Sequence, residues 1–153
     1  MAEFTYNPIQ TVQPNQQVLL NTTIGCNKGY VLHREGSGIV TLRGIVNCST
    51  SCFARYQVTF NGNIAIPEGG TISPIAIAVA IDGEPVLTSR ALFTPADVDT
   101  YGNVTSTAII TVPKGCCFNV SVENVSPIPT TPAGANAPAI EVQNANLVIS
   151  RIA

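Results

Sequence analysis

The chain has 153 residues, of which 45% are hydrophobic and only 10% are charged. An average soluble protein carries about 25% charged residues, so part of this surface is suited to burial against copies of the chain or a partner. The formal charge is −2, and the seven Lys and Arg residues are scattered along the chain. This scatter excludes the basic cluster expected of a nucleic-acid-binding protein.

Membrane insertion and export are also not indicated. No segment approaches the ~20 consecutive apolar residues that cross a bilayer. The N-terminal sequence MAEFTYNPIQ lacks the basic segment and apolar core of a secretory signal peptide. We therefore expect a protein made in the cytoplasm without a signal peptide and without a membrane partner.

The first 16 residues, MAEFTYNPIQTVQPNQ, are polar with isolated Phe4, Tyr6 and Ile9. Such a segment is typical of an arm that docks on a neighbouring subunit. The rest of the chain has the usual length of one domain and is long enough to bury a substantial core. The predicted organisation is an N-terminal arm at 1–16 and one folded domain at 17–153.

The remainder of the chain has the pattern of an all-β protein. Helical periodicity is almost absent, and Gly, Pro, Asn and Thr interrupt the sequence at intervals of roughly ten residues. This pattern predicts an antiparallel two-sheet sandwich or a barrel. Strands are expected around residues 17–24, 29–35, 39–46, 53–60, 63–66, 74–81, 86–93, 104–112, 117–125 and 139–152.

Five turns are expected between these strands, because each contains a Gly for positive φ or a Pro with fixed φ. They are EGSG at 35–38, FNGN at 60–63, PEGG at 67–70, IDGEP at 81–85 and VPKG at 112–115.

The segment TISPIAIAVAIDG at 71–83 is apolar on both sides of the expected strand. Its large residues fall on one face, and Ala76, Ala78 and Ala80 fall on the other. A strand of an antiparallel sandwich usually presents a polar face to water. We therefore predict that the three alanines lie in a subunit interface. The alternative is a central strand covered by a loop of its own chain.

The strand at 117–124 alternates regularly, with Phe118, Val120 and Val122 opposite its polar residues. The next segment, SPIPTTPAGANAP at 126–138, contains four prolines. This composition excludes regular structure. We expect an exposed loop at one end of the sandwich.

The search for catalytic residues finds no convincing set. His33 is the only histidine, and no nucleophile elbow, paired catalytic carboxylate or cofactor fingerprint accompanies it. The REGSG sequence after it lacks the lysine of a phosphate-binding loop and is interpreted as a hairpin turn. We predict a structural histidine, no cofactor and no enzymatic activity.

The loop TPADVDTYGN at 94–103 carries Asp97, Asp99 and Asn103. Closely spaced oxygen ligands can bind calcium, but the glycine and distal glutamate of an EF-hand loop are missing. A solvated loop with side-chain-to-backbone turns is the preferred interpretation.

The five cysteines are Cys26, Cys48, Cys52, Cys116 and Cys117. Reduced thiols are the default in a cytosolic product. A zinc site is disfavoured, because adjacent strand residues such as Cys116 and Cys117 point to opposite faces. A disulfide of Cys48 with Cys52, or of either with Cys26, is the alternative in oxidising surroundings. Cys116 and Cys117 are interpreted as packing residues first and as a crosslink second.

The C-terminal sequence supports a more specific fold. AIITVPKGCCFNVSVENVS at 108–126 and IEVQNANLVISRI at 140–152 resemble the closing strands of the tumour-necrosis-factor-like jelly roll, which the globular heads of complement-type proteins share. ARYQVTFNGNIAI at 54–66 resembles the aromatic-rich central strand of that fold. The resemblance implies an all-β, two-sheet antiparallel jelly-roll sandwich that forms a trimer.

A second resemblance concerns GYVLHREGSGIVTLRG at 29–44 and VPKGCC at 112–117. These stretches resemble small structural proteins of phages and prophages of Gram-positive gut bacteria. The resemblance implies a virion protein on the capsid surface, a homotrimeric decoration protein whose partner is the major capsid protein or another virion protein. The alternative is a cell-surface or spore-coat jelly roll, or an adhesive tip, that binds carbohydrate or a receptor at loops 94–103 and 126–138.

Overall fold

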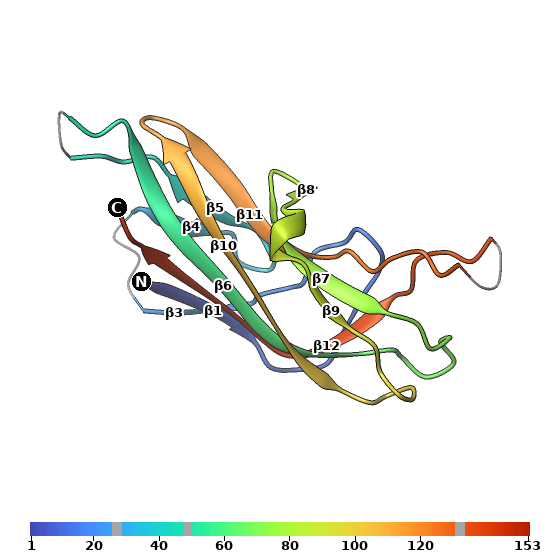
Figure 1. The fold of residues 1–153 in the computed structure, drawn as a ribbon. Helices are drawn as coiled ribbons and strands as arrows, with labels where there is room; N and C mark the ends of the chain where they lie inside the picture. Colours follow the sequence, from blue (N-terminus) through green and yellow to red (C-terminus); the bar gives the residue numbers. More distant parts are fainter. Residues whose placement is uncertain (26–28, 48–49, 131–133) are drawn as a thin grey trace.

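The computed structural model describes residues 1–25, 29–47, 50–130 and 134–153. These residues form a sandwich of two six-stranded antiparallel sheets, sheet A and sheet B, and one short 3-10 helix, η1 (Leu87–Ser89). Figure 1 shows an elongated molecule with the strands running along its length. Among the described residues, no helix has the length and apolarity needed to cross a membrane. The two-sheet, all-β prediction is confirmed.

Sheet A has the strand order β10-β6-β12-β1-β3, and β2 pairs with another part of β12. Its strands are β1 (Ala2–Tyr6), β2 (Gln10–Val12), β3 (Thr22–Ile24), β6 (Phe53–Ala65), β10 (Gly102–Pro113) and β12 (Ile140–Arg151).

Sheet B has the strand order β4-β5-β11-β7-β8, and β9 pairs with β7. Consecutive long strands alternate between the sheets, since β10 and β12 lie in sheet A and β11 in sheet B. Its strands are β4 (Val31–His33), β5 (Val40–Arg43), β7 (Ile75–Ile81), β8 (Glu84–Pro85), β9 (Ala91–Phe93) and β11 (Cys117–Asn124).

Strand β6 is central to sheet A, with β10 on one side and β12 on the other. Tyr56 and Phe60 on its inner face are fully buried in the core between the sheets. The predicted turn at 60–63 is wrong, because β6 continues through Gly62. A Cβ atom at this glycine would lie 2.9 Å from Cζ of Phe60. Gly62 therefore leaves room for an aromatic ring and is not a turn residue.

The prediction of an N-terminal arm at 1–16 is wrong at residues 2–6, which form strand β1 of sheet A. β1 pairs with both β12 and β3, and Phe4 is fully buried. Ala2 and Phe4 face inward while Glu3 and Thr5 alternate with them, which is the two-residue period of a strand. The apolar residues were too few to distinguish this period from a polar segment.

Four of the five predicted turns are confirmed. Asp82 and Gly83 both have positive φ, 51° and 82°, as a tight hairpin requires. In the VPKG turn, the Cys116 backbone N–H donates to the Pro113 carbonyl over 3.0 Å, and Gly115 has a φ of 81°. This turn connects β10 in sheet A to β11 in sheet B.

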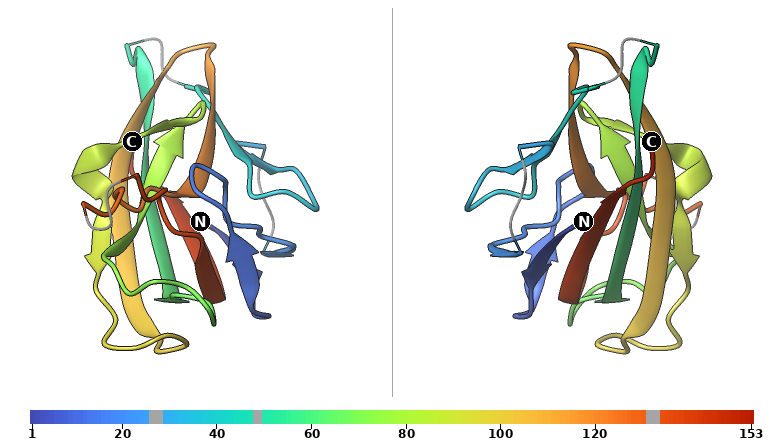
Figure 2. Two further views of the ribbon diagram at one scale, coloured as in Figure 1. Left: turned by 90° about the vertical axis from the view of Figure 1, so that its right-hand side faces the viewer. Right: turned by 90° about the vertical axis from the view of Figure 1, so that its left-hand side faces the viewer.

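The two ends of the sandwich differ. Both chain termini lie toward the left of Figure 1, and loop 66–74 and the described residues of 126–139 lie at the opposite end. Figure 2, which looks along the molecule from each end, shows the two sheets facing each other. The described residues of 126–138 contain no strand or helix, as the prolines predicted.

Candidate functional site

The three alanines of β7 do not form a free surface. Ala76, Ala78 and Ala80 are each 0% exposed in the single chain. The large residues of β7, such as Ile77, pack in the core between the sheets as predicted. The predicted subunit interface at these alanines is therefore wrong. The chain itself covers them, as in the alternative, although neighbouring strands and not only a loop provide the cover.

Neighbouring strands supply this cover. Ala78 lies opposite Glu123 in the register of β7 and β11, and Ala80 lies opposite Pro85 of β8. The side chains of directly paired residues stand on the same face of a sheet. The larger neighbours therefore enclose the small alanine side chains.

Residues 84–93 form an interrupted strand along the free edge of β7. The Ser89 hydroxyl accepts a hydrogen bond from the Val79 backbone N–H over 3.0 Å and donates to the Val86 carbonyl over 2.7 Å. Ser106 of β10 also donates to the Ser89 carbonyl. These bonds fix η1 between the edges of the two sheets, so this side of β7 is closed to a partner strand.

Sheet A presents the open surface of the molecule. We define the sheet A outer face by the outward residues in the middle of β10, β6, β12, β1 and β3. Of these, Glu3 and Arg55 carry charge, and Ile109 is 64% exposed. The residues are Thr105, Thr107, Ile109, Thr111, Arg55, Gln57, Thr59, Asn61, Asn146, Val148, Ser150, Glu3, Thr5, Thr22 and Ile24.

Polar side chains on the sheet A outer face bond to one another across the strands. Asn61 donates to the Thr105 hydroxyl over 3.2 Å, and Thr107 donates to the Thr59 hydroxyl over 3.3 Å. A polar group that already has a partner costs less to remove from water. The face is therefore polar in composition but inexpensive to cover.

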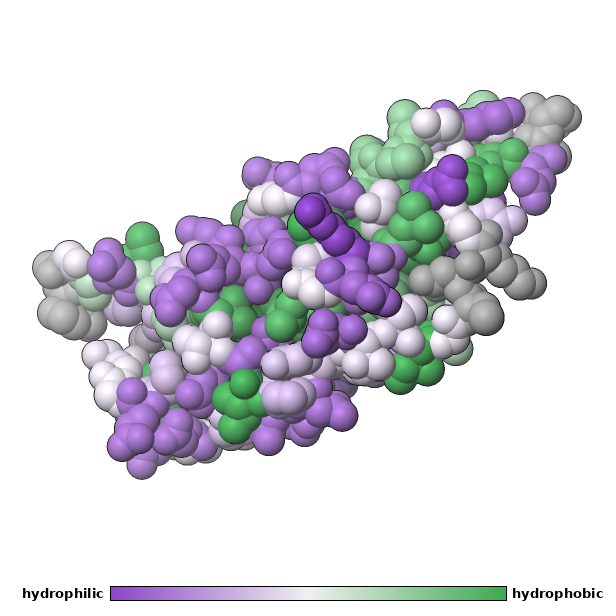
Figure 3. Space-filling view, turned by 180° about the vertical axis from the view of Figure 1, so that it is seen from behind, coloured by the Kyte–Doolittle hydropathy of each residue, from purple (hydrophilic) through white to green (hydrophobic). Residues whose placement is uncertain are grey.

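Exposed hydrophobic residues are dispersed elsewhere. On the side of the molecule in Figure 3, green residues occur in small groups separated by purple ones. The described residues on that side form no single broad apolar patch of the kind that marks a hydrophobic docking site.

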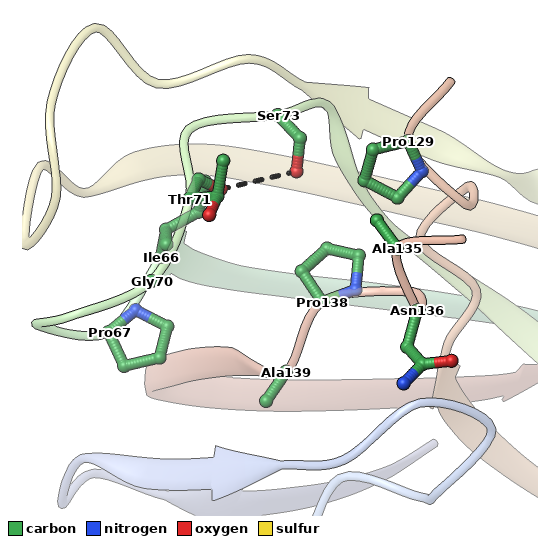
Figure 4. Close-up of a pocket in the computed structure, with 10 residues that line it drawn as sticks. All are labelled: Ile66, Pro67, Gly70, Thr71, Ser73, Pro129, Ala135, Asn136, Pro138 and Ala139. Carbon is green, nitrogen blue, oxygen red and sulfur yellow. Dashed lines mark hydrogen bonds between the residues drawn. The ribbon is translucent and has the colours of Figure 1, made fainter. Parts of the chain in front are cut away.

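A pocket of about 300 Å³ lies between loop 66–74 and the described residues of loop 126–139. Figure 4 shows Pro67 on one loop and Pro129 and Pro138 on the other. Ser73 and Asn136 supply polar groups at the same pocket. None of the pocket residues is charged, so the pocket fits an uncharged ligand or side chain. Its lining is Ile66, Pro67, Gly70, Thr71, Ser73, Pro129, Ala135, Asn136, Pro138 and Ala139.

Loop 94–101 is attached to this end of the molecule. The Asp99 backbone N–H donates to the Ile66 carbonyl over 2.9 Å, and the Tyr101 hydroxyl donates to Oε2 of Glu141 over 2.8 Å. Burial and then the Glu141 carboxylate raise the pKa of Tyr101 to about 12. Tyr101 therefore stays protonated and continues to donate.

Asp97 and Asn103, two of the possible calcium ligands, form hydrogen bonds with different parts of the chain. Asp97 accepts from the Val98 backbone N–H over 2.8 Å, whereas the Asn103 amide donates to Asn61 and Asn63 of β6 over 2.9 and 3.1 Å. Within the described ranges, no group of three or more His, Cys, Asp or Glu side chains could hold a metal ion. The arrangement favours the solvated-loop interpretation.

His33 has structural partners at both ring nitrogens. Nε2 lies 3.2 Å from the Ser37 carbonyl oxygen, which can only accept, so the hydrogen is on Nε2. Nδ1 lies 2.8 Å from the Thr23 hydroxyl, and the ring centroid lies 4.8 Å from that of Phe4. This histidine connects β4 to β3 and β1, in agreement with the predicted structural role.

Three of the five cysteines lie within the described residues. Cys52, Cys116 and Cys117 are exposed free thiols. Cys52 and the PKGCC turn are neighbours, because the Lys114 backbone N–H donates to the Cys52 carbonyl over 2.9 Å. Neither Cys116 nor Cys117 is buried, so the packing role is wrong for both. Cys26 and Cys48 lie outside the described residues, and so does each predicted disulfide, because every such pair contains one of them.

Comparison with known proteins identifies the fold class. No protein-family model matches the sequence, and no curated protein matches it. Solved structures do match over nearly the whole chain. They are the globular domain of zebrafish complement 1qA (TM-score 0.56, 14% identity, covering 96% of this chain and 94% of that one), Eiger TNF from S. frugiperda (0.63, 9%, 100% and 92%) and murine APRIL (0.51, 12%, 93% and 97%).

These similarities establish the architecture. The chain has the jelly-roll fold of tumour-necrosis-factor and complement globular domains, as its C-terminal strands predicted. At 9–14% identity the similarity shows the fold alone. The activity has to be argued from the surfaces of this chain.

Proposed function

We propose that this chain is a non-enzymatic structural protein that self-associates as a homotrimer and decorates or cements a phage capsid. The observation that carries the proposal is the sheet A outer face, where two charged residues occur on a broad surface of threonines, asparagines and aliphatic side chains. Depletion of charge is what distinguishes the core of a protein interface from the rest of a surface.

Composition supports the same interpretation. Only 10% of the residues are charged, which leaves an isolated domain poorly solvated. Covering the sheet A outer face in a trimer would remove Ile109 and Ile24 from water at little cost in charge desolvation. The fold is compatible with this packing, since the sheet is open on that side.

Attachment to the capsid would be strengthened because a trimer has three copies of each contact surface. A trimer presents each contact three times, and the second and third contacts form at high effective concentration. Weak contacts of one chain with the major capsid protein would then hold the assembly firmly. The resemblance of residues 29–44 and 112–117 to phage structural proteins favours a virion location over other assemblies.

A matched pair of substitutions tests self-association. Ile109 on the sheet A outer face is 64% exposed, and Leu32 on the outer side of sheet B is 47% exposed. Ile109→Glu should convert the trimer to monomer in a native mass measurement, because three carboxylates would enter a covered surface. Leu32→Glu should leave the trimer intact. Equal behaviour of the two variants would refute the assignment of the interface to sheet A.

The virion location is tested on purified particles. Quantitative mass spectrometry should find this chain in particles at a fixed ratio to the major capsid protein. Cryo-electron microscopy should place it on the outside of the shell as three-fold symmetric density. Particles that lack the chain would contradict the proposal.

The second candidate is a cell-surface or spore-coat protein, or an adhesive tip, that binds carbohydrate. The pocket between loops 66–74 and 126–139 favours it, since proline rings offer apolar surface and Asn136 and Ser73 offer hydrogen bonds. Gln13 is exposed and does not line this pocket, so it provides a control. Glycan binding that is lost in Asn136→Ala and retained in Gln13→Ala would support this candidate. No binding on a broad glycan array would remove it.

A further inference from the structure

A second hollow lies on the outer side of sheet B, over Ser121 and Glu123 of β11. It consists of two adjoining cavities of about 250 and 410 Å³, which share Gln17 and Glu123 as lining residues. The β7–β8 turn contributes Asp82, and β11 contributes Asn119. This hollow lies on the opposite sheet from the face proposed for self-association and does not depend on that proposal.

Glu123 is the unusual residue of this hollow. It belongs to the outward side of β11, yet its side chain is only 7% exposed. Gln17 flanks it on one side through a bridge, and Ala78 lies opposite it on the other. Three backbone hydrogen bonds of 2.7–3.0 Å attach segment 15–18 to Val122 and Asn124. Backbone hydrogen bonds therefore hold segment 15–18 beside Glu123 and keep its side chain buried.

The Glu123 carboxylate is incompletely satisfied. Within the described part of the chain, its side chain has one hydrogen-bond partner, the Ser121 hydroxyl, which donates to Oε1 over 3.0 Å. A carboxylate has about four lone-pair sites, and buried charges are normally paired. Glu123 lines both cavities of the hollow, so a ligand there can use the acceptor positions that remain.

Among the described residues, the charged side chains that line the hollow or act on Glu123 are all negative. Asp82 lines the hollow. The Glu84 carboxylate, in the β7–β8 hairpin, repels the Glu123 carboxylate electrostatically. None of the described residues that line either cavity is basic. Burial, with a smaller effect from Glu84, raises the pKa of Glu123, while the Ser121 hydrogen bond opposes this. A cation in the hollow would stabilise the ionised carboxylate.

The shape and lining restrict the kind of cation. The 250 Å³ cavity is several times the ~30 Å³ of a water molecule. Ile39 forms part of its wall and offers apolar contact. Calcium and magnesium prefer six or more oxygen ligands with several carboxylates, and no group of three or more metal-binding side chains occurs among the described residues.

We propose that this hollow binds a primary alkylammonium group, with the ammonium on Glu123 and the alkyl chain against Ile39. The ammonium has three donors for the Glu123 carboxylate, the amide oxygen of Gln17 and the second lone pair of the Asn119 amide oxygen. The first lone pair of that oxygen accepts from the Thr41 hydroxyl over 2.8 Å. The group comes either from a lysine side chain of a partner protein or from a free polyamine. Nothing covalent is formed, and the interaction is reversible.

The test uses the intact protein in phosphate buffer and small probes. Butylammonium is titrated against ¹⁵N-labelled protein, and the amide shifts of Ser121 and Glu123 are followed. We expect saturable shifts with a dissociation constant in the millimolar range, about −4 kcal/mol of binding. Butanol has similar size without charge and should not produce these shifts.

Two near-isosteric variants locate the binding group. Glu123→Gln should weaken butylammonium binding at least tenfold, because it removes the buried charge. Asp82→Asn should weaken it less, because Asp82 is exposed. Asn retains the oxygen that accepts from the Asn119 backbone N–H and tolerates the φ of 51°. Unchanged shifts of core amides in both variants show that the fold is preserved.

The binding results distinguish a protein lysine from a free polyamine and include results that would contradict the proposal. Equal binding of butylammonium and a capped lysine indicates a protein side chain, and markedly tighter binding of putrescine or spermidine indicates a polyamine. Binding of butanol equal to that of butylammonium would overturn the proposal. So would butylammonium binding unchanged in Glu123→Gln, or no shift at any probe concentration up to about 100 mM.

Discussion

The outward sides of the two sheets differ although both follow the same two-residue period. On sheet A the outward residues are mostly exposed threonines, asparagines and aliphatic side chains. On sheet B, around β7 and β11, Ala78, Ser121 and Glu123 point outward and are buried. Segment 15–18 and residues 84–93 lie along those strands and close the surface. The position of a residue along the strand therefore determines the face of the sheet on which its side chain lies. Neighbouring segments determine whether that side chain is exposed.

This contrast assigns different roles to the two sides. The sheet A outer face is broad, weakly charged and open, which suits contact with another protein surface. The outer side of sheet B is covered around β7 and β11, and it carries a hollow lined by one buried carboxylate, which suits a small charged group.

Ala78→Glu should give the largest effect on stability. The substitution introduces a carboxylate at a fully buried site directly opposite Glu123. Burial of an unpaired charge beside a like charge should lower the free energy of unfolding by about 4 kcal/mol or more. Urea denaturation of the variant measures this loss.

Leu92→Glu is the matched control on the same side of sheet B. Leu92 lies opposite Ala76 and is 55% exposed. A charge here remains hydrated, so the loss should stay below about 1 kcal/mol. Similar losses in both variants would mean that the alanine side of β7 is not closed.

Tyr56→Phe should give an intermediate effect and tests the connection between the sheets. The Tyr56 hydroxyl of sheet A donates to the Arg43 carbonyl of sheet B over 2.6 Å. Its removal leaves that carbonyl without this donor and should cost about 1–2 kcal/mol in urea denaturation. Tyr101→Phe, at a half-buried position, should cost less than about 1 kcal/mol. A larger loss at Tyr101 would contradict this order.

Glu123→Gln should change the pH dependence of stability. Burial raises the folded-state pKa of Glu123 above 4.5, so the native state binds more protons than the unfolded state above that pH. The parent protein therefore loses stability as pH rises from the unfolded-state pKa to the folded-state pKa, by about 1.4 kcal/mol for each pH unit that separates the two values. The variant should be the more stable protein near neutral pH.

Urea denaturation from about pH 4 to pH 8 in amine-free buffer checks this sign. The difference between the two proteins should vanish below the ordinary glutamate pKa, where both side chains are neutral. A parent protein that gains stability relative to the variant as pH rises would show that Glu123 has a stabilising partner in the folded chain.

The thiols should give the smallest effect. Cys52, Cys116 and Cys117 are exposed, so a thiol reagent should label all three in the folded protein. Cys116→Ser and Cys117→Ser should each change stability by less than about 0.5 kcal/mol. Mass spectrometry of the labelled, unreduced protein counts the modified residues, and protection of these three would indicate crosslinks.

The sequence predicted the sandwich because its signals are local. Gly83 and Gly115 mark turns in which positive φ is required, and Val120 and Val122 alternate with polar residues along β11. The similarity of residues 108–126 and 140–152 to tumour-necrosis-factor-like strands then predicted the topology. Local periodicity and turn chemistry are sufficient for this level of detail.

The sites were harder to predict because they depend on contacts between distant segments. Ala78 and Glu123 are far apart in the sequence, and segment 15–18 beside Glu123 comes from the other end of the chain. The pattern of β11 assigns Glu123 to solvent and contains no signal for its burial. Gly62 misled the turn prediction because its partner, the Phe60 ring, is visible only in three dimensions.

The central claim, that the sheet A outer face is covered in a homotrimer, is tested most directly by the native mass of the unaltered protein. With a chain mass of 16.0 kDa, three copies give 3 × 16.0 = 48.0 kDa. Native mass spectrometry and light scattering should both give this value and retain it on dilution to about 1 μM. A mass of 16.0 kDa at every concentration would contradict the account.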